Sequence, residues 1–110
     1  MSETKIDISR ASKAIRDSRF VEALSMLESN LAKDPDHLES LYFAAVCSRY
    51  LKNYKDSQKY LENLLTKAPD MGRAYQELGH LSKAVGNEEN AASHYRQACE
   101  LNPALISSWK

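Results

Sequence analysis

The three prolines of the chain are evenly spaced. Pro35, Pro69 and Pro103 follow one another at intervals of 34 residues in a chain of 110 residues. Proline cannot continue a helix, because its ring removes an N–H donor and collides with the preceding turn. Breaks at a constant interval of about 20 to 50 residues are typical of stacked structural repeats. The spacing therefore predicts a chain built from similar units laid side by side.

Each unit is expected to contain two helices. Leu24, Leu27 and Leu31 lie at i, i+3 and i+7, which places them on one helix face. Polar turns at 17–19, 52–53 and 86–87 divide the units. The pattern predicts an all-α fold with helices near 4–17, 21–33, 38–51, 55–67, 72–85 and 88–101, and a seventh beginning near Leu105. We expect the polar residues beside the prolines to start the following helix or end the preceding one: Asp36, Asp70 and Asn102.

Charge and hydropathy exclude several classes of partner. The chain has 15 basic and 15 acidic residues, whereas a nucleic-acid-binding surface needs a basic excess. The longest apolar run covers only 41–47, which is too short for a membrane span or a secretory signal. Cys47 and Cys99 lie in helical, partly apolar stretches without metal-ligand spacing, so we interpret them as buried thiols of a cytoplasmic protein. We predict no nucleic-acid or membrane partner.

No catalytic or cofactor site is predicted. The three glycines, Gly72, Gly79 and Gly86, are seven residues apart and form no phosphate loop. Glu77 and His80 share a helix face and could act as an acid and a base, but a solvated polar pair is the better interpretation. We therefore expect no catalytic residue, no metal, no cofactor and no enzymatic activity. We expect Gly79, in the middle of a helix, to be compensated by a close contact.

The third unit carries aromatic, leucine and small residues at a characteristic spacing: Tyr75, Leu78, Gly79, Ala91, Tyr95, Ala98 and Pro103. In these positions the unit resembles the tetratricopeptide repeat (TPR) family. The resemblance implies one domain over 1–110, with units near 4–37, 38–71 and 72–105 and the start of a further unit at 106–110. It also implies a helical-hairpin array coiled into a right-handed superhelix.

In this family the first helix of each unit lines a concave groove that binds a partner peptide or helix. The resemblance assigns to the groove Tyr42, Val46, Arg49, Tyr50, Arg73, Gln76, His80 and Lys83. Arg49, Tyr50 and Arg73 could bind a partner, whereas Phe43 is expected to pack in the core. The positions that hold a chaperone C-terminus in one TPR subtype carry a single basic residue here, Arg73, so that partner is not expected.

A second resemblance is to the N-terminal TPR segment of bacterial sulfotransferase proteins, in 75–81, 98–105 and 108–109. It implies an alternative function, an accessory domain that recruits partners to a larger enzyme, and a chain that is the N-terminal fragment of a longer protein. Such a fragment would expose an apolar end face, through which we expect it to associate with itself: Leu78, Leu81, Tyr95, Leu101 and Trp109.

Overall fold

The computed structural model describes residues 8–102. Within this range the chain forms six helices and no strand: α1 (Ser9–Arg16), α2 (Phe20–Lys33), α3 (Leu38–Tyr50), α4 (Tyr54–Lys67), α5 (Gly72–Ala84) and α6 (Glu88–Leu101). The predicted all-α repeat fold is confirmed. The observed ends lie within one residue of the predicted ones, except that α1 begins at Ser9, with Ile8 as its N-cap, instead of near residue 4. The first residues of the helix expected from residue 4, and the seventh helix expected near Leu105, lie outside the described residues.

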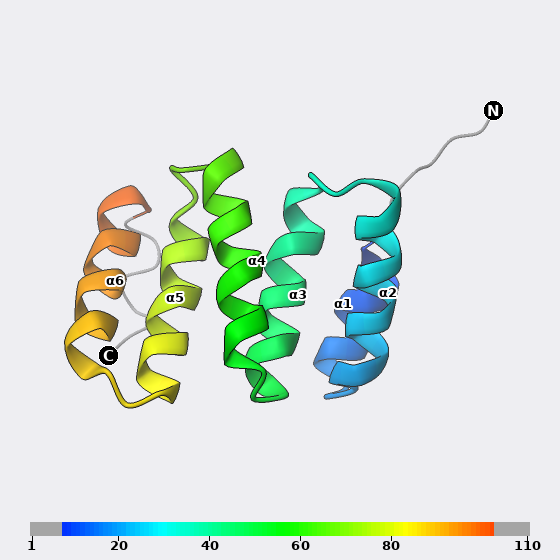
Figure 1. Ribbon diagram of the computed structural model, residues 1–110, viewed down its shortest axis with the longest axis horizontal. Coiled ribbons are helices and arrows are strands. Elements are labelled where there is room, and N and C mark those ends of the chain that lie inside the picture. The colour runs from blue at the N-terminus through cyan, green and yellow to red at the C-terminus, as the bar shows by residue number, and fades with distance from the viewer. Residues whose placement is uncertain (1–7, 103–110) are drawn as a thin grey trace.

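The helix pairs stand side by side, with α1 and α2 at one end, α3 and α4 in the middle and α5 and α6 at the other end (Figure 1). Each helix packs against the next, and the strongest packing joins the two helices of the third unit, α5 and α6. The first helices of the second and third units, α3 and α5, also contact each other directly. First helices approach one another in this way when they lie on the inner side of a curved array.

Three equivalent residues end the first helices in the left-handed conformation. Their φ angles are 62° at Ser18, 68° at Lys52 and 83° at Gly86. The amide that follows each one donates to a carbonyl five residues back at 2.8 Å, namely Arg19 to Ala14, Asn53 to Ser48 and Asn87 to Ser82. This is a Schellman motif, which favours glycine because a Cβ is strained at positive φ. Only the third unit has glycine there.

The helix starts correct one expectation. The imidazole Nδ1 of His37 accepts a hydrogen bond from the Ser40 amide at 3.3 Å and caps α3. Asp36 instead pairs with Lys67 of α4 at 3.3 Å. Met71 rather than Asp70 occupies the N-cap of α5, without a side-chain bond. The two aspartates lie one residue too early, because one more turn residue separates each proline from its helix.

Two apolar clusters hold the units together. One joins the first and second units around Ala11, Leu27 and Cys47. The other joins the second and third units through buried side chains of α3, α4 and α5: Leu41, Ala45, Leu61, Leu64, Ala74 and Leu81. Small residues let the helices approach closely while leucines fill the space between them.

Gly79 has the close contact that its position in mid-helix predicts. A Cβ on this residue would lie 2.5 Å from Cε1 and 2.6 Å from Cδ1 of Tyr95. The equivalent pairs in the other units are Ala11 with Leu27 and Ala45 with Leu61. The larger tyrosine ring of the third unit therefore requires the smaller glycine opposite it.

The expected bare end face is wrong at two of its residues. Leu81 is 6% exposed and packs into the cluster between the second and third units, and Tyr95 is 8% exposed against Gly79. Leu81 therefore faces the second unit, and Tyr95 faces α5 within its own unit. Leu78 is half-buried and Leu101 exposed, while Trp109 lies outside the described residues.

Candidate functional site

The eight predicted groove residues form two adjacent stripes. Tyr42, Val46, Arg49 and Tyr50 lie at i, i+4, i+7 and i+8 of α3, and Arg73, Gln76, His80 and Lys83 lie at i, i+3, i+7 and i+10 of α5. Each spacing keeps its members on one side of its helix. Because α3 and α5 contact each other, we call these eight residues the α3–α5 face.

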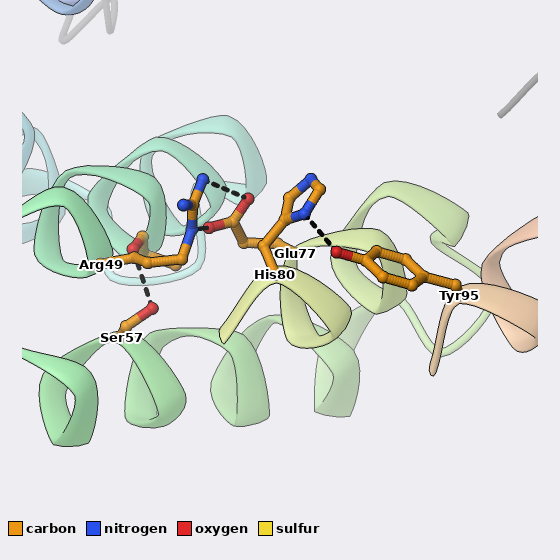
Figure 2. Close-up of polar contacts among 6 residues, drawn as sticks. Arg49, Ser57, Glu77, His80 and Tyr95 are labelled. Carbon is orange, nitrogen blue, oxygen red and sulfur yellow. Dashed lines mark hydrogen bonds and ion pairs between the residues drawn. The ribbon is translucent and has the colours of Figure 1, made fainter. Parts of the chain in front are cut away.

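A buried ion pair crosses the centre of this face. The Arg49 Nε donates to Oε2 of Glu77, and Nη2 of Arg49 lies 3.5 Å from Oε1 (Figure 2). The Glu77 side chain is only 3% exposed. Burial raises the pKa of Glu77 above its ordinary 4.5, while the Arg49 guanidinium opposes that rise. The pair therefore neutralises both charges and joins α3 to α5.

His80 bonds to the neighbouring helix instead of to Glu77. Its Nδ1 lies 2.6 Å from the Tyr95 hydroxyl of α6, as Figure 2 shows. Burial lowers the pKa of His80, and the nearby positive charges of Arg49 and Lys83 lower it further. The expected solvated Glu77–His80 pair is thus wrong, because each side chain has a partner on a different helix.

Two arginine–tyrosine contacts flank the ion pair. The Arg73 guanidinium lies over the Tyr42 ring at 4.6 Å from its centroid. Arg49 lies over Tyr50 at the same distance, and Phe20 of α2 stacks on Tyr50 with centroids 4.4 Å apart. Such cation–π contacts are attractive and help to fix the position of an aromatic ring. Tyr50 is 53% exposed.

Sequence reasoning places Phe43 correctly and misses Phe20. Phe43 packs against the cluster between the first two units and meets the Tyr42 ring edge-on at 5.2 Å. Phe20 begins α2, the second helix of the first unit, so its position gave no reason to assign it to a face made by first helices. Only the packing of α2 against α3 brings its ring to Tyr50.

The cations of the α3–α5 face differ in their partners. Arg49 is neutralised by Glu77, whereas Arg73 and Lys83 are exposed and form no ion pair within the described part of the chain. Tyr42 lies near enough to Arg73, Arg49 and Glu77 for all three charges to act on its pKa, which burial raises overall. The face thus carries two free positive charges beside a neutral centre.

Between residues 8 and 102 no group of three or more His, Cys, Asp or Glu side chains could hold a metal ion. Burial raises the pKa of Cys47 to about 12, so this thiol is protonated and unreactive at neutral pH. In the same range no helix has the length and apolar character to cross a membrane.

Two family models match the chain, both described as tetratricopeptide repeat, over residues 14–81 and 72–105. The chain belongs to the tetratricopeptide repeat family. Neither family model is of a sulfotransferase, and the similar solved structures, a TPR of Spaghetti and two MamA proteins, are not sulfotransferases either. A search of curated proteins gives no significant match.

Solved TPR structures share the fold at low sequence identity. The first TPR of Spaghetti (RPAP3), bound to the HSP90 peptide SRMEEVD, has a TM-score of 0.79 and 19% identity, covering 87% of this chain and 76% of that one. MamA of AMB-1 has a TM-score of 0.78 and 15% identity, over 88% of this chain and 57% of that one. MamA from Desulfovibrio magneticus RS-1 has a TM-score of 0.77 and 22% identity, over 91% and 56%. The chain thus spans little more than half of these MamA chains.

Proposed function

We propose that the chain is a protein-interaction module that binds a partner peptide or helix on the α3–α5 face. The observation that carries this proposal is the exposed tyrosine and arginine cluster on adjacent first helices. Tyr50 is half-exposed yet fixed by Phe20 and Arg49, and Arg73 is exposed over Tyr42. Tyrosine and arginine are the side chains most enriched at binding hot spots, and rigid rings lose little entropy on binding.

The relatives support this use of the fold. The Spaghetti TPR is a structure with a bound peptide, which shows that an array of this shape can hold one. We propose that the present chain binds its peptide without contacting a terminal carboxylate. At the positions that hold a terminal carboxylate in chaperone-binding TPR proteins, Glu77 of this chain is an acid already paired with Arg49, and Phe43 is packed in the core. A carboxylate there would meet too few donors.

We also propose a cytoplasmic location. Cys47 is a free thiol, buried in the cluster between the first two units. Free thiols of this kind are typical of a reducing compartment.

The test is a selection of displayed peptides on the purified chain, followed by affinity measurements with variants. Tyr50→Ala should weaken a selected peptide by about 1–4 kcal/mol without a matching loss of stability, because the side chain lies half in solvent. Val21→Ala is the control, since Val21 is an exposed apolar residue on α2. Peptides that bind Tyr50→Ala and Tyr42→Ala as well as they bind the unmodified chain would place the interaction elsewhere.

A further inference from the structure

The zero net charge of the chain conceals a separation of charge between its two layers of helices. The first helices α1, α3 and α5 carry six basic and two acidic residues, namely Arg10, Lys13, Arg16, Arg49, Arg73 and Lys83 against Glu39 and Glu77. The second helices α2, α4 and α6 carry five basic and seven acidic residues, namely Lys33, Lys55, Lys59, Lys67 and Arg96 against Glu22, Glu28, Asp56, Glu62, Glu88, Glu89 and Glu100. The first helices together are therefore positive, mainly through α1, and the second helices together are negative, through α2 and α6.

Pairing leaves two cations of the α3–α5 face without an acidic partner among the described residues. Glu77 is neutralised by Arg49, which removes one acid and one base from the centre. His80 is held neutral by burial and by its positive neighbours, and its ring is bonded to Tyr95. The charge left on the α5 side of the face is that of Arg73 at one end and Lys83 at the other. Glu39 is the acidic residue on the first turn of α3.

The separation of Arg73 and Lys83 determines the length of extended peptide that can contact both cations. Arg73 and Lys83 are ten residues apart on α5, and a helix rises 1.5 Å per residue, so they stand about 15 Å apart along its axis. An extended peptide rises about 3.3 Å per residue and covers that distance in four to five residues. The surface between them is uncharged, with Gln76 and His80 on α5 and Val46 on α3.

We propose that the α3–α5 face binds an extended segment of a partner protein that carries two acidic side chains four to five residues apart, with uncharged residues between them. This inference rests on the proposed function and names the chemistry of its ligand. Arg73 and Lys83 pair with the two carboxylates, and the tyrosines and the neutral centre contact the residues between. The acidic excess on α2 and α6 disfavours binding of the same segment to those helices.

A library of peptides with blocked ends tests the spacing. Each peptide carries two glutamates separated by zero to eight randomised uncharged residues, so that no terminal carboxylate contributes. Selection on the purified chain should enrich peptides with glutamates at i and i+4 or i+5, and their binding should weaken as salt is raised, because the contacts are solvent-exposed ion pairs. Enrichment without acidic residues, or equal enrichment at every spacing, would overturn the proposal.

A charge-matched pair of variants tests the residues. Arg73→Gln with Lys83→Gln should weaken the enriched peptides roughly 2- to 30-fold and abolish the preference for spacing, since exposed ion pairs contribute about 0.2–1 kcal/mol each. Lys55→Gln with Lys59→Gln removes the same charge from α4 and should leave the affinity and the spacing preference unchanged. Equal losses in the two double variants, or equal competition by a single-stranded oligonucleotide, would show a non-specific response to charge.

The same data separate this proposal from the proposed function. If selected peptides depend on Tyr50 but lack the acidic pair, the face binds peptides and the acidic ligand is wrong. If no selected peptide depends on Tyr42 or Tyr50, the proposed function itself fails.

Discussion

Replacing Gly79 by alanine tests how closely the third unit is packed. In an exposed helix this change stabilises by about 1 kcal/mol, because alanine is the better helix former. Here the new methyl group would lie 2.5 Å from a ring carbon of Tyr95. Overpacking of a core costs about 1–3 kcal/mol. The ring cannot swing aside freely, because its hydroxyl is bonded to His80 at 2.6 Å and that bond contributes about 0.5–1.5 kcal/mol.

We therefore expect Gly79→Ala to lower the free energy of unfolding by about 1–3 kcal/mol. The second variant is Tyr95→Leu, which recreates the alanine–leucine pair of the first two units. In that background Gly79→Ala should cost little or stabilise, giving a coupling energy of at least about 1 kcal/mol. Urea unfolding followed by circular dichroism measures all four proteins of the cycle.

Gly86→Ala is the control. It costs about 1 kcal/mol through its φ of 83° alone, because a Cβ there meets nothing within 4 Å. Its effect should be the same with or without Tyr95→Leu. A stabilising Gly79→Ala in the unmodified chain, or a cost unchanged by Tyr95→Leu, would refute the steric reasoning.

Three further changes have signs that the structure fixes. Arg49→Met should destabilise by about 3 kcal/mol at neutral pH, because it leaves the Glu77 carboxylate buried without its cation. Burial raises the pKa of Glu77 above 4.5, so as the pH falls the folded variant binds a proton at a higher pH than the unfolded chain does. The loss in free energy of unfolding relative to the unmodified chain should therefore be smaller at pH 5 than at pH 7.5. Lys52→Gly should raise the unfolding midpoint by removing about 1 kcal/mol of strain at a φ of 68°, and a lower midpoint would contradict this. Ser48→Ala should stabilise by up to about 1 kcal/mol in thermal melts, because the Ser48 hydroxyl is buried without a hydrogen-bond partner, whereas a loss would reveal one.

The residues of the α3–α5 face show how much of a site a sequence pattern can predict. A 34-residue register assigns Tyr42, Arg49 and Arg73 to one side of their helices, and in the structure Arg73 of α5 lies over Tyr42 of α3. It also indicates that Gly79 needs a compensating neighbour, which is Tyr95. The 34-residue spacing allows these predictions because residues at equivalent positions of stacked units occupy similar environments.

The sequence by itself determined the repeat, the helix pairs, their approximate ends and the face that each first helix presents. These depend on proline breaks and on helical periodicity, which act over a few residues. Only the tertiary structure decided which side chain neutralises Glu77, which ring supports Tyr50 and which residue caps α3. Those choices depend on distances between helices that lie far apart in the chain. A buried carboxylate must find a partner wherever packing provides one, and no spacing along the chain reveals it.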